Sequence, residues 1–588
     1  EISHYLKKDV LLLEEVFEKQ NTSFHLETEC NMTSFISVAQ ASYEVWLDYL
    51  HIKNPADERD FIYLPTLKQE EFFRDIRHIK NRTNPIHCGG IYGGRCYPVK
   101  KEFHSTDFNY EDEEISLSHI TDYLVYIDVN SLYPAAMSIF DYPTGKCYPI
   151  KSESDIKNWN DEIINKILPE QQKLKNSSGG RTVRLRGKFG SFSNQAILYV
   201  KYSPNKYLAH SVHPHKTLDG NLKWDLNDGE GVYTSVDVEN MILHGYKVEI
   251  TLHPTHEVAG YFWKSSLPIF KTFVEHYNKK KEEASKLNQL ALRALCKLFT
   301  NSLYGKTTQR AVNTKEQWIN SSDELFAFYD KYSVTEYKYF EETEKLYLCG
   351  YARGEILREK NITKPCYLGA FVLANSRSIM LEYKVDCNPY FDIAEEPELH
   401  PLQIKNDFWY TDTDSIVVHS SSINNIELHD TKLGMMSNEL NKYPNPKIIE
   451  GYFIAPKLYC LGFLTDESHL PPTEDELNDM KQCKKYFVIK NGKKIYYILK
   501  GKGTPISRMK NGIPQWEISP EAYINMTNGG THTTQQTMSI KKTGFENKFT
   551  IEQLSSSCTK RTLNKTSWSG RSFFDDGTSV PHGHASAK

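Results

Sequence analysis

The stretch Tyr410-Thr411-Asp412-Thr413-Asp414-Ser415 places two aspartates between two runs of aromatic and β-branched residues. Asp407-Phe408-Trp409 precedes it and Ile416-Val417-Val418 follows it, a pattern that predicts a β-hairpin with acids at its tip. Side chains alternate along an extended chain, so Asp412 and Asp414 are expected on one face. Neighbouring carboxylates repel each other unless a cation lies between them, and such oxygen ligands suit Mg²⁺. The alternative is a solvated turn, because six residues alone are a weak motif.

Composition limits the class of protein. The 588 residues are enough for several domains. The formal net charge is only −4, so any surface that binds nucleic acid must be local. The eleven cysteines contain no Cys-x-x-Cys pair, which argues against zinc sites and against a secreted disulfide scaffold. No apolar run approaches the roughly 18–20 residues that span a bilayer, so we expect no membrane partner.

A second acidic position follows a strand-like run. Tyr123-Leu124-Val125-Tyr126-Ile127-Asp128 is typical of a buried strand that ends in an acid. In the segment Asn130–Met137, Asn130 or Ser131 can cap a helix, and Pro134 is tolerated in a first turn. A strand–helix junction of this kind can present Asp128 as a metal ligand. A capping or turn aspartate is the alternative.

Residues 271–305 carry the clearest helical pattern. One apolar stripe is formed by Leu287, Leu290, Ala291, Ala294, Leu295 and Leu298. A neighbouring stripe is formed by Lys286, Arg293, Lys297, Asn301 and Tyr304. Cations and an aromatic ring on one face suit a triphosphate and a stacked base or sugar. Chance exposure of Lys and Arg is the alternative.

Three further regions carry patterns. Residues 366–384 are apolar enough for a buried helix. Lys457 and Tyr459 are two residues apart and are expected on one face of a strand. Residues 481–510 contain ten Lys or Arg and no acid, with aromatic residues interleaved, which indicates a nucleic-acid surface or a one-sided solvated hairpin. The Ser/Thr-rich end, from about residue 545, is expected to be partly disordered.

Four motifs together resemble those of family B DNA polymerases. Asp128-Val129-Asn130-Ser131-Leu132-Tyr133-Pro134 resembles the first catalytic motif, and Tyr410–Ser415 resembles the second. Lys297-Leu298-Phe299-Thr300-Asn301-Ser302-Leu303-Tyr304-Gly305 is similar to the fingers motif, and Lys457-Leu458-Tyr459 to the Lys-x-Tyr motif. The four occur in the family's order. The resemblance covers residues ~115–510.

Long spacers narrow the resemblance to the protein-primed polymerases of viruses, linear plasmids and self-synthesising transposons. Residues 150–262 and 312–365 are similar to the two insertions of that group, which contact a priming protein and encircle DNA. Tyr92-Gly93-Gly94 is similar to the group's Tyr-x-Gly-Gly motif but lacks the spacer residue. The segment Lys565–Arg571 is similar to a closing motif of the same group. The location this implies is intracellular: mitochondrial for a plasmid-encoded enzyme, otherwise nuclear or at a site of viral replication.

The resemblance implies an α+β right-hand polymerase with an antiparallel palm sheet, helical fingers and a basic thumb. It also implies a division of the chain into nine parts. They are 1–25, an exonuclease remnant; 26–115, a linker and palm-flanking region; 116–149, palm; 150–262, first insertion; 263–311, fingers; 312–365, second insertion; 366–470, palm; 471–545, thumb; and 546–588, a tail.

The implied reaction is attack of a primer hydroxyl on the α-phosphate of a deoxynucleoside triphosphate, with a DNA template and release of pyrophosphate. Two Mg²⁺ ions, or Mn²⁺ in their place, would be held by Asp128, Asp414 and the Val129 carbonyl, with Asp412 in a supporting catalytic role. The positions implied for nucleotide binding are Ser131, Leu132, Tyr133, Lys286, Arg293, Lys297, Asn301 and Tyr304. Those implied for DNA binding are Gly305, Tyr410, Thr413, Lys457, Tyr459, Lys493, Lys494, Lys500 and Lys502.

Tyr5-Leu6-Lys7-Lys8-Asp9 is similar to the third motif of the family's 3′–5′ exonuclease. The first two motifs normally lie upstream, so we expect Tyr5 and Asp9 to belong to a remnant that does not proofread. Three alternatives to an active polymerase are a reverse transcriptase, a non-catalytic DNA-binding or priming protein, and an inactive polymerase remnant that only binds DNA. A reverse transcriptase usually carries two adjacent acids at the hairpin, unlike Asp412-Thr413-Asp414.

Overall fold

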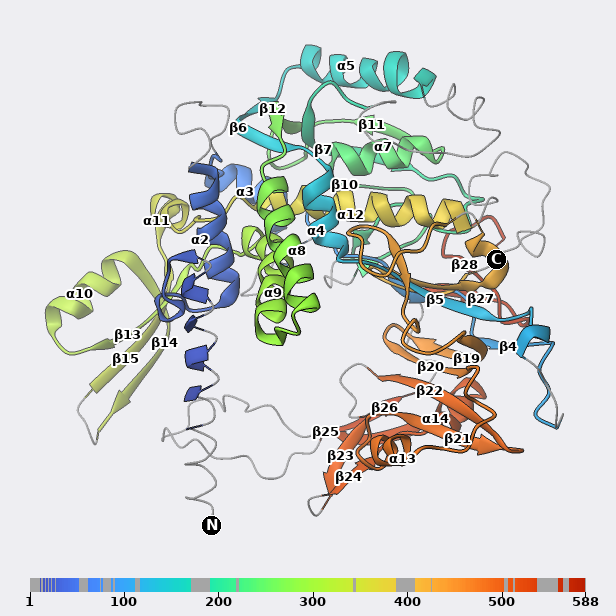
Figure 1. Ribbon diagram of the computed structural model, residues 1–588. Helices are drawn as coiled ribbons and strands as arrows, with labels where there is room; N and C mark the ends of the chain where they lie inside the picture. Colours follow the sequence, from blue (N-terminus) through green and yellow to red (C-terminus); the bar gives the residue numbers. More distant parts are fainter. Residues whose placement is uncertain are drawn as a thin grey trace.

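The computed structural model describes residues 11–586 except for 12–13, 16, 20, 23, 27, 52–61, 75, 78–85, 88–89, 112–116, 171–190, 218–221, 342–344, 388–407, 425, 502–505, 511–512, 537–558 and 564–569. The chain forms an α+β fold around one large antiparallel sheet (Figure 1). This confirms the expected fold class. None of the described helices is both long and apolar enough to cross a membrane.

The large sheet, here called the palm sheet, has ten strands. Eight follow the order β21-β22-β20-β19-β5-β17-β16-β3, while β18 pairs with β5 and β4 with β19. Their bounds are β3 Cys96–Pro98, β4 Glu102–His104, β5 Leu124–Val129, β16 Phe408–Asp412, β17 Ser415–His419, β18 Met436–Asn438, β19 Lys447–Ala455, β20 Leu458–Leu464, β21 Tyr486–Lys490 and β22 Lys493–Gly501.

Both predicted elements around the acidic motifs are present. Strands β16 and β17 form the hairpin, and β5 leads into helix α4 (Leu132–Ile139). Val125, Ile127 and Val129 pack with residues of helix α12 (Cys366–Cys387), while Leu124 belongs to the core on the opposite face. Because side chains alternate along β5, Asp128 is directed away from α12. The predicted buried helix over 366–384 is thus confirmed, and it covers one face of the palm sheet.

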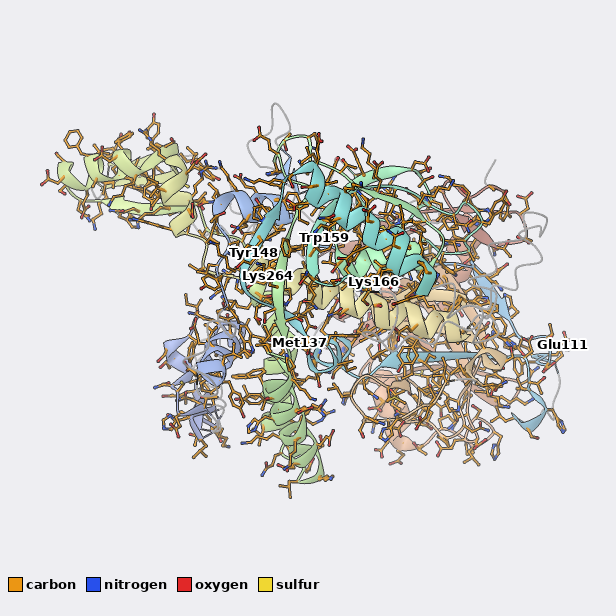
Figure 2. All side chains as sticks on the ribbon, turned by 90° about the horizontal axis from the view of Figure 1, so that it is seen from above. Glu111, Met137, Tyr148, Trp159, Lys166 and Lys264 are labelled. Carbon is orange, nitrogen blue, oxygen red and sulfur yellow. The ribbon has the colours of Figure 1, made fainter. Side chains whose placement is uncertain are left out.

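The first insertion is built on a second antiparallel sheet of order β10-β7-β12-β6, with β11 paired to β7. Its elements are β6 Tyr142–Ile150, α5 Glu153–Glu162, a π-helical turn Ile163–Ile167, β7 Gln195–Ser203, β8 His215–Lys216, β9 Leu222–Lys223, β10 Gly229–Thr234, α7 Ser235–Leu243, β11 Lys247–Ile250 and β12 Gly260–Leu267. The sheet therefore extends beyond the expected insertion of 150–262 at both ends. Figure 2 shows Tyr148 and Lys264 beside each other on this sheet, near α5, with the Lys264 ammonium 4.5 Å from the centre of the Tyr148 ring.

The fingers consist of two helices, α8 (Lys271–Lys286) and α9 (Leu290–Thr307), rather than one continuous helix. Asn288 has a left-handed φ of 54°, which interrupts the helix and shifts the phase of the apolar positions. The predicted apolar stripe is wrong, because Leu287, Leu290 and Leu298 are more than half exposed. The buried face of α9 is instead formed by Cys296, Phe299, Thr300, Leu303 and Thr307.

Helix α2 (Val38–His51) packs against α9 and fixes the fingers to the body of the protein. Trp46 is fully buried, donates from Nε1 to the carbonyl of Ile269 at 3.0 Å and stacks on Phe270 at 4.8 Å. Burying one aromatic side chain of this size contributes about 1.5–3 kcal/mol. The remaining elements that precede the palm are a 3₁₀ turn Met32–Ser34, α3 Leu67–Arg74, β1 Ile76–Arg77, β2 Ile86–His87 and a 3₁₀ turn Leu117–His119.

The segment predicted as the second insertion is a small module at the far side of the molecule from β27 and β28 (Figure 1). It contains β13 Thr314–Ile319, α10 Ser322–Lys331, β14 Tyr332–Phe340, β15 Lys345–Ala352 and α11 Gly354–Lys360. Ile319, Phe328 and Leu348 form a core of its own under α10. The module therefore buries its apolar face without help from the palm.

The thumb region continues the palm sheet through β21 and β22. Its other elements, with those that follow, are a 3₁₀ turn Ser420–Ile423, α13 Glu474–Lys481, β23 Ser507–Lys510, β24 Ile513–Trp516, α14 Pro520–Thr527, β25 His532–Gln536, β26 Thr559–Leu563, β27 Arg571–Phe573 and β28 Ser579–Pro581. Part of the Ser/Thr-rich end is ordered, because β27 and β28 form a hairpin that packs on earlier parts of the chain.

Candidate active site

The two acidic motifs meet at the centre of the palm sheet. Asp128 lies opposite Ser415 in the β5–β17 pairing, and the Val129 amide donates to the carbonyl of Asp414 at 2.8 Å. The Asp414 amide donates to the carbonyl of Asp412 at 2.7 Å, which closes a tight turn over residues 412–415, here called the catalytic turn. Strand pairing thus brings Asp128 beside Asp414, although they are far apart in sequence.

Gly94 of the Tyr92-Gly93-Gly94 motif lies against this turn. Thr413 has a left-handed φ of 58°, and its amide donates to the carbonyl of Arg95 at 2.6 Å. A Cβ at Gly94 would lie 2.8 Å from Thr413 Cγ2 and 3.0 Å from Thr413 Cα. Only glycine fits there without moving the turn. The Tyr92-Gly93-Gly94 motif therefore forms part of the surface on which the catalytic turn packs.

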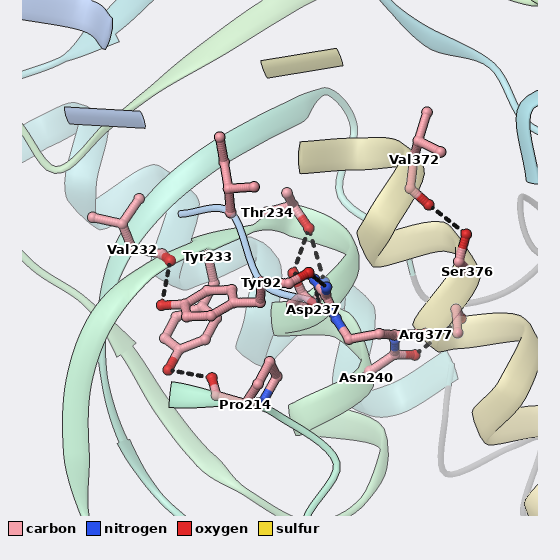
Figure 3. A network of polar contacts seen from close by, with 12 residues as sticks. Tyr92, Pro214, Val232, Tyr233, Thr234, Asp237, Asn240, Val372, Ser376 and Arg377 are labelled. Carbon is pink, nitrogen blue, oxygen red and sulfur yellow. Dashed lines mark hydrogen bonds and ion pairs between the residues drawn. The ribbon is translucent and has the colours of Figure 1, made fainter. Parts of the chain in front are cut away.

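An ion pair holds this glycine motif to the first insertion. Arg377 of α12 donates through Nη2 to both carboxylate oxygens of Asp237 at 2.9 Å, and through Nη1 to the carbonyl of Tyr92 (Figure 3). Tyr92 donates its hydroxyl to the carbonyl of Val232 at 3.1 Å. All of these side chains are buried, so the network fixes α12, α7 and the glycine motif together.

A cavity of about 710 Å³ opens between the palm sheet and the fingers. Asp128, Val129 and Asp414 line its palm wall, and Lys286, Arg293 and Lys297 line its fingers wall. The other predicted positions that line it are Ser131, Leu132, Tyr133, Asn301 and Tyr304. Lys286 reaches the cavity from α8 and the other cations from α9, so two helices supply the stripe that was expected from one.

Burial and repulsion by neighbouring carboxylates raise the pKa values of the two aspartates that line this cavity, Asp128 and Asp414. Burial, together with the charges of Asp414 and Glu439, raises the pKa of Asp128 to about 8. Burial also raises the pKa of Asp414, an effect to which Asp412 adds. A cation between the two carboxylates would relieve this repulsion. Asp128, Asp414 and the Val129 carbonyl therefore fit a hard divalent ion, although no group of three or more acidic, His or Cys side chains at metal-ligand spacing exists in the described residues.

Two tyrosines close one end of the cavity. The ring of Tyr133, in the first turn of α4, stacks on the ring of Tyr304 of α9 at 4.2 Å. Ser131 precedes α4 with a left-handed φ of 54° and makes no side-chain capping bond, so its expected capping role is absent. This sharp entry into the helix places Tyr133 directly after the strand that carries Asp128.

Several cavity residues were not predicted from sequence. They are Asn130, Lys281, Glu282, Ser285, Asp430, Thr431, Ser437 and Glu439. Burial lowers the pKa of Lys281, an effect that Glu282 opposes and Lys297 strengthens. The lysine-rich face of α8 could have indicated Lys281. Glu439 follows β18, and no local pattern links this short strand to β5.

Asp412 does not line the cavity, because it forms an ion pair with Lys457. Lys457 lies in the turn between β19 and β20 with a φ of 59°, so the expectation that it shares a strand face with Tyr459 is wrong. The Lys457 amide donates to the buried Tyr410 hydroxyl at 2.7 Å. The Tyr459 hydroxyl lies 3.0 Å from that of Tyr126. These side chains form a polar cluster behind the catalytic turn.

The basic run of the thumb is only partly on the surface. Lys500 is exposed and Lys493 half-buried at the two ends of β22. Lys494 is 2% exposed and donates to Glu476 at 2.8 Å, so the structure contradicts its expected place on a DNA-binding surface. The strand alternation turns Lys494 into the core. Lys502, Tyr5 and Asp9 lie outside the described residues. At Gly305 an added Cβ would meet nothing within 4 Å.

The sequence matches a protein family described as DNA polymerase type B, organellar and viral, over residues 1–388. A DNA polymerase of Kluyveromyces lactis is 24% identical over 419 residues, which are 71% of this chain and 33% of that protein. A probable DNA polymerase of Podospora anserina is 23% identical over 483 residues, 78% of this chain and 31% of that protein. The chain thus spans about a third of the length of these curated relatives.

Solved structures of Phi29 DNA polymerase are also similar. The complex with primer-template DNA has 16% identity and a TM-score of 0.43, over 80% of this chain and 60% of that chain. The complex with primer-template DNA and incoming nucleotide substrates has 14% identity and a TM-score of 0.42, over 79% and 68%.

Proposed function

This chain belongs to the type B DNA polymerases of the organellar and viral kind, and we propose that it adds deoxynucleotides to a DNA primer under the direction of a template strand. The observation that carries the proposal is the cavity between palm and fingers, where Asp128 and Asp414 face Lys286, Arg293 and Lys297. Cations on one wall suit a triphosphate, and carboxylates on the other suit the metal ions of phosphoryl transfer. A remnant that only bound DNA would need neither wall.

We propose Mg²⁺ as the metal, with Asp128, Asp414 and the Val129 carbonyl as its protein ligands. Bound there, divalent ions would activate the primer hydroxyl and neutralise the charge on the leaving phosphates. The raised pKa values of Asp128 and Asp414 support this assignment, because burial and neighbouring carboxylates both disfavour their charged forms and a bound cation would offset both effects. The charge of Asp412 is instead balanced by Lys457.

The other cavity residues orient the nucleotide. Lys297, Arg293, Lys286 and Lys281 would hold the triphosphate along the fingers wall. Arg293 donates from Nε to Ser285 at 3.1 Å, which orients its guanidinium and ties α9 to α8. Tyr133 and Tyr304 form a stacked floor for the sugar and base. The bulk of Tyr133 would exclude a ribose 2′-hydroxyl.

We further propose that replication starts on the hydroxyl of a priming protein, as the sequence resemblance implies, and that the enzyme serves a linear DNA element. Both insertions support this, since each forms a sheet of its own, separate from the palm sheet.

The test is extension of a labelled primer on a DNA template with Mg²⁺ and deoxynucleotides. We expect template-dependent products, and none from an Asp414→Ala variant that binds the same DNA. Extension of an RNA template at the same rate would favour a reverse transcriptase. DNA binding without extension by the intact chain would favour an inactive remnant.

A further inference from the structure

The β27–β28 hairpin is docked between the palm edge and the first insertion. The Ser579 hydroxyl donates to the carbonyl of Val99, next to the edge strand β3. The Leu226 amide donates to the carbonyl of His582 at 2.8 Å, and the Ala585 amide to that of Lys206 at 2.9 Å. The hairpin therefore contacts two parts of the fold that lie far from it in sequence.

Arg571 is the centre of this contact. Its side chain is 3% exposed, and its Nη2 donates to the carbonyl of Ala209 at 3.0 Å and to that of Ser579 at 2.9 Å. Its Nε donates to the Ser579 hydroxyl at 2.7 Å. The guanidinium lies 5.3 Å from the centre of the Tyr97 ring, on β3. Arg571 thereby holds the backbone segment 209–211 of the first insertion against the palm edge.

The same segment is also held by Arg95. Arg95 is 6% exposed and donates through Nη2 to the carbonyl of Ser211 at 2.5 Å, while its guanidinium lies 4.3 Å from the centre of the Trp224 ring. The carbonyl of Arg95 accepts the amide of Thr413, at the tip of the catalytic turn. A continuous path of contacts thus runs from Arg571 through segment 209–211 and Arg95 to Thr413.

Three basic side chains are buried along this path, with Lys384 beside the two arginines, and burial, with the charges of both arginines, lowers the pKa of Lys384 well below its ordinary value. Lys384 donates to the Thr411 hydroxyl at 2.8 Å, just before the catalytic turn. In the part of the chain that the structure describes, no carboxylate forms an ion pair with any of the three. A buried guanidinium group without a counter-charge is costly, so the geometry of the carbonyl and hydroxyl acceptors decides where Arg95 and Arg571 lie. Displacement of one is expected to displace its neighbours.

We propose that Arg571 is a positioning residue for the catalytic turn, which it fixes through segment 209–211 and Arg95. A catalytic carboxylate that moves by about 1 Å loses on the order of 100-fold in rate, so a distant anchor of this kind controls turnover without touching substrate. The consequence for turnover rests on the proposed polymerase function. The mechanical coupling between Arg571 and Thr413 does not.

The experiment compares the full chain with Arg571→Gln, Arg571→Lys and a matched control, Asp575→Ala, whose side chain is exposed on the same hairpin. Hydrogen–deuterium exchange reports the amide of Thr413. We expect exchange in the peptide that contains residues 411–415 to rise about tenfold in Arg571→Gln, to rise less in Arg571→Lys and to stay unchanged in Asp575→Ala. Faster exchange only within 571–581, with 411–415 unchanged, would overturn the proposal.

Single-nucleotide kinetics supply the second readout. We expect kcat of Arg571→Gln to fall about tenfold and the Mg²⁺ concentration for half-maximal rate to rise, with KM for the nucleotide within about twofold of the intact chain. Equal losses in kcat and DNA affinity would indicate general destabilisation and would overturn the proposal.

If Arg571→Gln does not fold, Ser579→Ala removes one bond to the same guanidinium. This variant should shift the exchange and the kinetic readout in the same direction, by less. Altered Thr413 exchange in a chain without polymerase activity would reject the proposed function and leave the coupling standing.

Discussion

The Lys457 ammonium lies 2.6 Å and 2.7 Å from the two carboxylate oxygens of Asp412. The Asp412 side chain is 15% exposed and that of Lys457 44% exposed, so the pair lies at the boundary between the palm core and solvent. Burial opposes the charge on Lys457, but the hydrogen bond and the charge of Asp412 outweigh it and raise the pKa of Lys457. Because of this ion pair, Asp412 lies outside the cavity that Asp414 lines, although only Thr413 stands between the two residues in sequence.

Replacement of Lys457 by Ala should therefore impair placement of the primer end more than overall DNA affinity. The variant frees Asp412 to add its charge to the cavity and removes a cation from the edge of the catalytic turn. We expect a lower rate of first-nucleotide addition with DNA affinity within about threefold, measured by quench-flow and by binding titration. The double variant with Asp412→Asn should be little worse than either single variant, since the two act as a pair. Additive losses would show that they act separately.

Asp128→Ala and Asp414→Ala should each abolish extension while DNA binding remains. Metal-ion stabilisation of the transition state is worth several kcal/mol, and each 1.36 kcal/mol is a factor of ten in rate. A loss of about a thousandfold or more is therefore expected in single-turnover incorporation. Asp475→Ala, at an exposed position of α13, is the matched control. Incorporation near the rate of the intact chain in either cavity variant would contradict the assignment.

Tyr133→Val should raise the use of ribonucleotides relative to deoxynucleotides. The Tyr133 ring is held by its stack on Tyr304, so the space that it fills is fixed. Loss of that bulk should change the ratio of kcat/KM values for the two sugars by about tenfold or more. Tyr133→Phe, which keeps the ring, is the control. An unchanged ratio in the Val variant would place the discrimination elsewhere in the cavity.

The thumb lysines should separate into two classes. Phosphate contacts make DNA affinity fall with salt, with a slope of about 0.9 for each contact. Lys493→Ala and Lys500→Ala together should weaken binding to any sequence and reduce the slope by about two. Lys494→Ala should leave the salt slope unchanged, because Lys494 is buried with Glu476. Titrations at several salt concentrations distinguish the two classes.

Lys494→Ala should act on stability instead. Burial opposes ionisation of Glu476, but hydrogen bonds from Lys494 and Tyr496 outweigh it and lower its pKa to about 2. A lowered carboxyl pKa stabilises the fold above the unfolded value of about 4.5 and ceases to do so as pH falls to about 2. Removal of Lys494 leaves a buried unpaired charge, at a cost of about 3–5 kcal/mol near neutral pH. Equal urea midpoints at pH 7 for the variant and the intact chain would contradict this.

Deletion of residues 312–360 should reduce processivity while short extension on a gapped template is retained. The module has its own core of Ile319, Phe328 and Leu348, so its removal should leave the palm and fingers folded. Product lengths on a long primed template, with a trap for released enzyme, measure the effect. Equal lengths for the deletion variant and the intact chain would exclude a role for this insertion in holding DNA.

Local pattern determined the elements that carry the chemistry. Alternation predicted the β16–β17 hairpin and the β5–α4 junction, and apolar content predicted α12. The same local motifs also indicated Asp128, Asp414, Lys297 and Tyr304, because each belongs to a short run of fixed spacing within one element. These features depend on interactions between residues close in sequence, so the pattern within one segment is enough to predict them.

The tertiary structure decided which of these residues meet and which are buried. Strand pairing brought Asp128 beside Asp414, the break at Asn288 divided the cations between two helices, and β18 brought Glu439 to the cavity. Lys494 was expected on a DNA-binding surface, yet it is buried against Glu476, and Arg571 is buried by partners far along the chain. Burial and strand register depend on contacts between segments that are far apart in sequence. The residue pattern of either segment alone does not predict those contacts.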